Sequence, residues 1–489
     1  MKLLLIIVEG QLYLAGILAV FVAELAFLLW GLWSRRPIVG LIAVFVTLPL
    51  MRSTVSAIRA CFFRTGAPGG IPLGRAAGRA LYDLAEEIRR AVGAPPVDSI
   101  TITGGFSASA AEYSSRLFRR HRTLVLGFPA LTTLSTTELR AVIAHELAHF
   151  SSAHDPYAAW VYRTHRSWWA LLAALNQRLA TPVYVYWLVR WYVPRLNTAS
   201  TEVARRHELV ADRVAATVSG NRAAADALVV FEAGARFADE THWPAIQISH
   251  ETAAEPPRPY SQMLTWEARI TSGDALDVLF TGAEREHTHP SLRERLARFG
   301  EPIRVPRPPG CSAGEEILGV ELQRLAAQLD HEWIERHGES WTRHRAEYLE
   351  RRATLHRLAA IETPTAEELF ERGEVLEILQ GTDEALPIYQ RAAEQGHAAA
   401  SLAAGRVRLG LMDSTGITLV ESAMDRDDNL VPEGCGILAE YYRGSNQELA
   451  ARKCDWRATR HRTRVRLAQE DARTLPSRPP GDRDAAAQR

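Results

Sequence analysis

The sequence predicts an α+β protein that is mainly α-helical. Three observations support this fold class: two apolar runs occupy residues 1–63, short segments with strand-like alternation lie between residues 99 and 127, and helical periodicity dominates residues 315–463. The chain has 489 residues, more than the roughly 250–300 at which a single core stops growing. We therefore expect several parts, beginning with a transmembrane hairpin over residues 1–63.

The hairpin prediction depends on the length of each apolar run. Gln11–Trp33 is apolar apart from Gln11 and Glu24, and it exceeds the about 20 residues that cross a bilayer. Pro37–Met51 is shorter and crosses only if its helix continues past Arg52 toward Phe62. A cleaved signal peptide is the alternative, but the first run is too long and lacks a small-residue cleavage site.

Basic residues beside the two runs bear on orientation. Lys2 precedes the first run, and a group of arginines follows the second: Arg52, Arg59, Arg64, Arg75 and Arg79. The positive-inside rule then puts both ends of the hairpin on the cytoplasmic side of an inner or plasma membrane, whereas Arg35 and Arg36 in the turn favour the reverse. We expect the part after residue 63 to face the cytoplasm because its flank is more basic.

The overall composition limits the partners and the redox chemistry. Lys+Arg and Asp+Glu are both 57, so the formal net charge is +0 and nothing suggests a nucleic-acid partner. The four cysteines are far apart and form no C-x-x-C motif. This spacing argues against a disulfide framework and a cysteine metal site, and it favours a reducing compartment.

Residues 64–127 combine a helix with two strand-like segments. Arg75–Val92 has helical periodicity and is followed by Gly93. Ser99–Thr103 alternates between polar and apolar residues, and Thr123–Gly127 is a second strand candidate. We expect these strands to form a small sheet beside the helix that follows.

That helix carries the motif around which the chain is organised. His145, Glu146 and His149 form H-E-x-x-H in an apolar run without Gly or Pro, and Ser135 and Glu138 have capping-box spacing at its start. Residues four apart share a helix face, so the two histidines can hold one metal ion while Glu146 lies near the water that the metal activates. Chance occurrence on an amphipathic helix is the alternative.

A site with two histidines needs a third protein ligand. Thr201–Ser219 has no Gly or Pro, and Glu208 and Asp212 lie four residues apart within it. Glu208 can ligate zinc, and Asp212 can hold a ligand histidine by its other ring nitrogen. The alternative is a solvated charged face, which nearby arginines make plausible: Arg205, Arg206 and Arg213.

Three segments of this chain resemble the M48 family of zinc metallopeptidases, gluzincins that include HtpX-like and CAAX-prenyl-protease-like enzymes. They are residues 126–150 around H-E-L-A-H, residues 206–213 with E-L-V-A-D, and residues 288–296 beginning T-H-P. The resemblance implies one Zn²⁺ per chain held by His145, His149 and Glu208, with Glu146 as general base. It also implies a peptidase domain over residues 64–300.

The resemblance leaves two points open. It brings the T-H-P loop to the cleft, where His289 would contact the metal or steady an oxyanion, but His289 can equally well cap a helix starting at Pro290. The family also commonly has an Asn-Ala pair on the edge strand that holds substrate, whereas residues 104–110 contain Ser107 and Ser109 and no Asn. This departure from the family pattern bears on the substrate contacts and not on the metal ligands.

An aromatic region separates the two ligand helices. Trp168–Leu175 and Val183–Val193 are rich in Trp, Tyr and Leu, but neither is long enough for a clear membrane span. Within residues 166–194 the sequence allows a second membrane-embedded pair, a lid at the interface or core helices, and it does not choose among them.

The C-terminal third is predicted to be helical and repetitive. Residues 301–362 read as a helical connector, and Gly373, Gly405 and Gly436 then recur at spacings of 32 and 31 residues. This period suggests helix-turn-helix repeats over residues 363–463 that resemble tetratricopeptide or Sel1-like units and could bind a protein partner. An irregular bundle is the alternative, and we expect a disordered tail over residues 464–489.

These observations predict a membrane-anchored zinc endopeptidase that hydrolyses misfolded or membrane-associated proteins, a role in protein quality control. Its expected partners are peptide or protein substrates and the lipid bilayer. The alternative is a proteolytically latent chaperone or scaffold whose repeats bind client proteins. Glu146 distinguishes the two, because a purely structural zinc site needs no base beside it.

Overall fold

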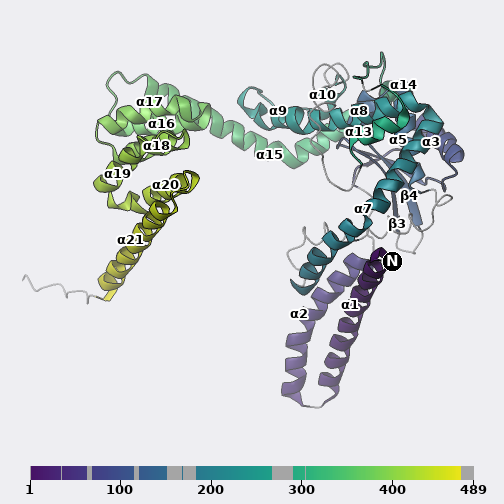
Figure 1. Ribbon diagram of the computed structural model, residues 1–489, viewed down its shortest axis with the longest axis horizontal. Coiled ribbons are helices and arrows are strands. Elements are labelled where there is room, and N and C mark those ends of the chain that lie inside the picture. The colour runs from purple at the N-terminus through teal and green to yellow at the C-terminus, as the bar shows by residue number, and fades with distance from the viewer. Residues whose placement is uncertain are drawn as a thin grey trace, which may run out of the picture. The chain divides into compact units, whose positions relative to one another are not determined.

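A computed structural model of the chain describes residues 2–34, 36–62, 69–114, 120–150, 168, 183–266, 290–302 and 304–474. The predicted fold class is confirmed: the molecule is mainly α-helical with one small sheet (Figure 1). The chain divides into two compact units. Unit 1 comprises Met1–Ser249 and Glu255–Glu339, and unit 2 comprises His250–Ala254 and Ser340–Arg489.

The N-terminal apolar runs form a pair of packed helices, α1 (Lys2–Trp33) and α2 (Pro37–Phe62). α2 continues past Arg52, as a second span would require. The pair is closely packed near its turn, since a Cβ on Gly31 would lie 2.3 Å from the Cβ of Ala43. Thr54 on α2 donates a hydrogen bond of 2.9 Å to Glu24, so the acidic side chain inside the first run has a polar partner.

Only one of these helices has the length and composition of a full membrane span. Leu3–Trp33 has a mean hydropathy of 2.4 and only 6% of its most apolar window is buried, whereas Pro37–Arg52 is a shorter apolar stretch. Large apolar side chains of both helices are exposed, including Leu12, Val22, Leu29, Ile38 and Phe45. Burial inside the protein therefore does not explain why α1 is apolar.

The sheet has four strands in the order β1-β2-β4-β3: β1 (Ile71–Pro72), β2 (Ser99–Thr103), β3 (Ala108–Ser114) and β4 (Arg120–Gly127). β2 and β4 are parallel, and both outer pairings are antiparallel. The predicted strand Ser99–Thr103 is confirmed, and the second begins earlier than expected, at Arg120. β3 occupies one edge of the sheet.

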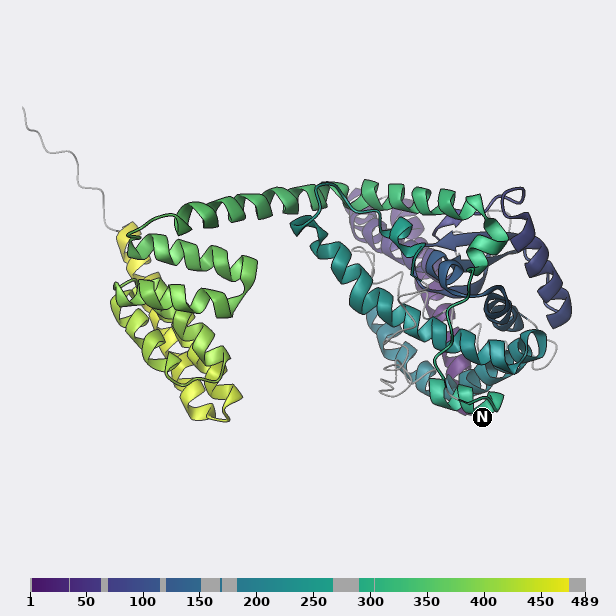
Figure 2. The ribbon, with the colours of Figure 1, turned by 90° about the horizontal axis from the view of Figure 1, so that it is seen from above.

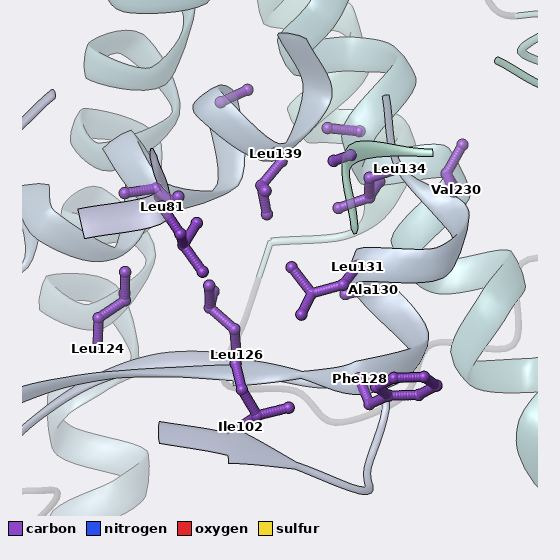
Figure 3. Packing of buried hydrophobic residues seen from close by; sticks show 14 of the residues in the cluster. Leu81, Ile102, Leu124, Leu126, Phe128, Ala130, Leu131, Leu134, Leu139 and Val230 are labelled. Carbon is purple, nitrogen blue, oxygen red and sulfur yellow. The ribbon is translucent and has the colours of Figure 1, made fainter. Parts of the chain in front are cut away.

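The core of unit 1 lies between this sheet and several helices, among them α3 (Arg79–Val92), α4 (Phe128–Thr133) and α5 (Thr136–Ala148). Figure 3 shows Leu81, Leu126, Leu131 and Leu139 converging in it, and all are at most 1% exposed. α5 begins with the predicted capping box of Ser135 and Glu138, in which each residue's side chain accepts a hydrogen bond from the other's backbone N–H. The motif helix is thus fixed at its start and along its buried face.

A single long helix, α7 (Val183–Ser219), replaces the separate segments expected on either side of Pro194. Near its start, Tyr192, Val193 and Leu196 are buried against α1, and the Tyr192 hydroxyl donates to the Ile6 carbonyl at 2.8 Å. Val189, Tyr192 and Val193 therefore pack on the first apolar helix. The other expected segment, Trp168–Leu175, lies outside the described residues apart from Trp168.

Several further helices and turns follow α7 in the described part of the chain. They are α8 (Asn221–Phe237), the π-helical turn η1 (Ala238–His242), α9 (Trp243–Ile248), the turn η2 (Ser249–Glu251), α10 (Pro259–Met263) and α13 (Leu292–Phe299). α13 begins at Leu292, and Ser291 caps it by accepting from the Glu294 N–H. The expectation of a helix starting at Pro290 and capped by His289 is therefore wrong.

The predicted connector over residues 301–362 is not a separate part. After α14 (Ala313–Leu318), the long helix α15 (Val320–Ala359) contributes Leu322, Leu325 and Leu329 to the core of unit 1. The division between the units falls within α15, after Glu339. The sequence could not show where unit 1 ends, because the apolar positions of α15 are spaced as in one continuous helix and do not mark a boundary after Glu339.

Unit 2 contains three helix pairs: α16 (Ala366–Gln380) with α17 (Thr382–Glu394), α18 (Ala398–Gly410) with α19 (Gly416–Arg426), and α20 (Val431–Gly444) with α21 (Glu448–Thr474) (Figure 2). A short turn, η3 (Asp428–Leu430), precedes α20. α21 continues to Thr474, so the expected disordered tail is wrong for residues 464–474. Whether the pairs are tetratricopeptide or Sel1-like units stays a prediction.

The glycines that suggested the repeat are not equivalent. A Cβ on Gly373 would lie 2.5 Å from Tyr389 of α17, and one on Gly405 would lie 2.6 Å from Val420 of α19. A Cβ on Gly436 would meet no atom within 4 Å, whereas a Cβ on Gly434 would lie 2.7 Å from Met424. Gly434 of α20 therefore packs against α19 of the preceding pair, and the regular 31-residue spacing to Gly436 does not mark a packed glycine.

Candidate metal centre

α5 and α7 pack together and bring His145, His149 and Glu208 to one point. The Nε2 atoms of the two histidines are 3.3 Å apart, and Glu208 Oε2 is 3.4 Å from His145 Nε2. Glu208 Oε1 is 3.7 Å from His149 Nε2. All three side chains thus direct a ligand atom into a common space, with the chosen atoms within 4.8 Å of one another.

The burial and chemistry of these groups fit a bound cation. His149 and Glu208 are only 8% and 5% exposed, so the carboxylate is held where an uncompensated negative charge is costly. Burial lowers the pKa of His145, but hydrogen bonds with Asp212 and Glu208 outweigh it and raise that pKa to about 9. The cluster therefore favours positive charge, and two imidazoles with one carboxylate are a donor set typical of catalytic zinc.

Asp212 holds His145 from behind. Its Oδ1 lies 3.1 Å from His145 Nδ1, which leaves Nε2 directed at the common point. This is the arrangement proposed from the sequence, in which a carboxylate fixes the ring orientation of a ligand histidine. Burial raises the pKa of the Asp212 carboxyl, but hydrogen bonds with Arg295 and His145 outweigh it and hold that pKa below its ordinary value.

Two neighbours of the cluster were missed from the sequence. Arg295 of α13 donates to both carboxylate oxygens of Asp212, from Nε at 2.8 Å and from Nη2 at 2.5 Å. His207 lies beside His149, with their Nδ1 atoms 3.0 Å apart and their rings stacked. Each stood in a segment already singled out, at 288–296 and 206–213, but spacing along one helix cannot reveal contacts between helices.

Glu146 lies on the side of α5 that faces the sheet. Its Oε2 accepts a hydrogen bond of 3.2 Å from the backbone N–H of Ala110, on the edge strand β3. The carboxylate is therefore beside the metal-binding cluster and beside the strand at which we expected peptide to dock. His289 lies outside the described residues, so its expected role at the metal or the oxyanion stays a prediction.

A helix-borne cluster of two histidines and one glutamate, next to a second helix glutamate that contacts the edge strand of a small sheet, defines a metallopeptidase-type centre. Residues 118–303 match the sequence model of peptidase family M48, and this part of the chain is an M48 peptidase domain. The match includes α5, α7 and α13, which carry the cluster, Asp212 and Arg295. A comparison with curated proteins found no match.

Proposed function

We propose that the protein is a membrane-anchored zinc endopeptidase that cleaves misfolded or membrane-associated proteins. The observation that supports it best is the convergence of His145 Nε2, His149 Nε2 and a Glu208 carboxylate oxygen beside Glu146. These three residues would hold one zinc ion. When bound, zinc would lower the pKa of a water molecule and polarise the scissile carbonyl.

In this proposal Glu146 is the general base. Its carboxylate takes a proton from the attacking water and later gives that proton to the leaving amine nitrogen. The Ala110 N–H at 3.2 Å restrains one carboxylate oxygen of Glu146 and so helps to orient the carboxylate. A purely structural zinc site would have no use for a carboxylate at this position.

The edge strand β3 is the proposed docking site for the peptide. Among the strands that the structure describes, β3 pairs with β4 alone, and the Ala110 N–H is directed away from β4 toward Glu146. A peptide that adds to such an edge is recognised mainly through its backbone. This mode suits unfolded segments of varied sequence, and it does not require the Asn that residues 104–110 lack.

The membrane anchor in this proposal is the α1–α2 pair. α1 is long and apolar enough to cross a bilayer, and the exposed leucine, valine and phenylalanine side chains of both helices would be unfavourable in water. Lys2 is the first residue of α1, and Arg52 and Arg59 lie in the second half of α2, so the positive-inside rule directs the peptidase domain to the cytoplasm.

A second candidate is a latent chaperone or scaffold that binds clients through unit 2. The three helix pairs of unit 2 favour it, because stacked pairs commonly present peptide-binding surfaces. Here the metal would be structural and Glu146 would have no role in a reaction.

One experiment separates the two candidates. Wild type, Glu146→Gln and the control Glu202→Gln, an exposed glutamate on α7, are purified in detergent and compared for zinc content and casein cleavage. The endopeptidase proposal predicts one zinc ion in each of the three proteins. It also predicts that the rate of casein cleavage falls by about 10²–10⁴-fold in Glu146→Gln alone. Zinc in all three proteins without cleavage in any would contradict the endopeptidase and favour the scaffold.

A further inference from the structure

The last helix of unit 2, α21, has one face packed in the unit and another face exposed. Ala451, Ala458 and His461 are at most 9% exposed and lie against the rest of unit 2. On the other side, Leu449, Trp456 and Leu467 are 79%, 63% and 50% exposed. Residues spaced 7 and 11 apart share one side of a helix, so these three form an apolar stripe directed at solvent.

Basic side chains flank this stripe. Residues 448–467 contain only two acidic residues, Glu448 and Asp455, against a set of basic ones: Arg452, Lys453, Arg457, Arg460, Arg462, Arg464 and Arg466. The whole chain has a net charge of +0, so this positive charge is a local concentration. Arg452, Arg457 and Arg464 form ion pairs within unit 2.

Three of the basic residues have no acidic partner among the described residues: Lys453, Arg460 and Arg462. The Arg460 guanidinium lies over the Trp456 ring at 5.3 Å, so the positive charge and the exposed aromatic ring occupy the same part of the helix. Trp and Leu beside Lys and Arg are typical of helices that lie in the plane of a membrane surface, where the rings enter the headgroup region and the cations meet lipid phosphates.

We propose that the exposed face of α21 binds the surface of a bilayer that contains anionic phospholipid. This goes beyond the peptidase function and does not depend on the metal cluster. It does draw on the proposed membrane anchor, because a chain held at a bilayer meets that surface at high effective concentration. Charge favours an anionic partner, and the apolar stripe favours lipid over nucleic acid, which would need no exposed Leu449 or Leu467.

The test uses the full chain in nanodiscs with a photoreactive phenylalanine analogue, p-benzoylphenylalanine, in place of Trp456. Nanodiscs of phosphatidylcholine alone are compared with nanodiscs of phosphatidylcholine and phosphatidylglycerol at 3:1, and lipid adducts are measured by mass spectrometry. The same analogue at Glu384, exposed on α17, is the control position. We expect adducts at position 456 in the anionic nanodiscs and about tenfold fewer in the neutral ones.

Charge variants show whether α21 itself is responsible. Lys453→Glu with Arg460→Glu should lower the adduct yield at position 456 by about tenfold. Arg343→Glu with Arg391→Glu makes the same charge change at exposed positions of α15 and α17 and should have little effect. Equal losses in both double variants would overturn the proposal.

The remaining outcomes are also decisive. If the chain incorporates into both kinds of nanodisc but forms no lipid adducts at position 456 in either, the proposal for α21 is overturned and the proposed membrane anchor is unaffected. If the chain does not incorporate, the anchor is wrong, and the same comparison is made with added vesicles of the two compositions. The same crosslinking can be done in native membranes. If the adducts at position 456 are removed by protease or nuclease and no lipid adducts form, the partner is a protein or a nucleic acid, and the proposal of lipid binding is overturned.

Discussion

Arg295 on α13 and Asp212 on α7 form a bidentate pair, 83 residues apart in sequence, directly behind a proposed zinc ligand. Asp212 in turn contacts His145 Nδ1. Arg295→Gln should leave Asp212 buried without its cation and His145 less well oriented. We expect zinc affinity to fall about 10–100-fold, measured by competition with a chelator of known affinity.

The neighbouring arginine provides a matched control for this prediction. Arg293 is exposed on the same helix, so Arg293→Gln should keep zinc affinity within about twofold of wild type. Arg295→Lys restores the charge but not the fork of two donors and should recover only part of the affinity. Wild-type zinc affinity in Arg295→Gln would show that Asp212 orients His145 without Arg295.

The backbone N–H of Ala110 provides a second prediction. Ala110→Pro removes the donor to Glu146, and proline is tolerated on an edge strand where the N–H does not pair with the neighbouring strand. We expect zinc content to be unchanged and kcat/KM for casein to fall at least about tenfold. Ala110→Gly keeps the N–H and should retain most activity, so equal losses in both variants would assign the effect to packing.

Metal removal should affect stability as well as activity. Without a cation, the buried Glu208 carboxylate and its two histidine neighbours lose their shared partner, so 1,10-phenanthroline should stop cleavage and lower the thermal midpoint. Zinc at 100 times its Kd should restore about 2.7 kcal/mol. Glu208→Gln should show little zinc-dependent shift in differential scanning calorimetry, and a full shift in that variant would exclude Glu208 as a ligand.

Two glycines of α1 allow a matched test of the helical hairpin. A Cβ added to Gly31 would meet Ala43 of α2, whereas a Cβ added to Gly16 would meet no atom within 4 Å. Gly31→Leu should therefore destabilise the detergent-solubilised protein by about 1–3 kcal/mol through overpacking. Gly16→Leu should be near neutral, and similar thermal midpoints for the two variants would contradict the packing of α1 on α2.

Unit 2 should lose stability in acid partly through Glu377. Burial alone raises the pKa of this carboxyl, but hydrogen bonds from Arg406 and Tyr389 outweigh burial and hold the pKa below 4.5. Because the folded pKa is depressed, the contribution is present above about pH 4.5 and is lost as the pH falls toward the folded value. Glu377→Gln should be less stable than wild type at pH 7. Between pH 3 and 5, the protection of its α16 and α17 amides from hydrogen exchange should depend less on pH than in wild type.

Features that depend on a local pattern were predictable from sequence. The capping box of Ser135 and Glu138 and the strand Ser99–Thr103 rely on neighbouring residues only, and both are present. The pairing of His145 with His149 could be proposed because residues four apart on a helix share a face. Glu208 was proposed because such a site needs a third ligand and because the family resemblance implies it.

Features that depend on packing between elements were not predictable. Arg295 and His207 act across helix interfaces, and Gly436, which the regular period singled out, is not closely packed. The continuity of α7 through Pro194 was also missed, because proline usually ends or kinks a helix and only its contacts with α1 explain why the helix extends so far.

In the proposed membrane-anchored peptidase, that continuity would limit the distance between the lipid and the metal-binding cluster. Tyr192, which contacts α1, and the proposed ligand Glu208 are 16 residues apart on α7, a rise of about 24 Å at 1.5 Å per residue. An extended chain covers this distance with about seven residues at roughly 3.3 Å each. With α1 in the bilayer, the length of α7 would set the distance between the lipid surface and the metal-binding cluster. A membrane-embedded substrate would then need only a short unfolded stretch outside the lipid to be cut. A tightly folded domain at the same distance from the lipid would not be cut.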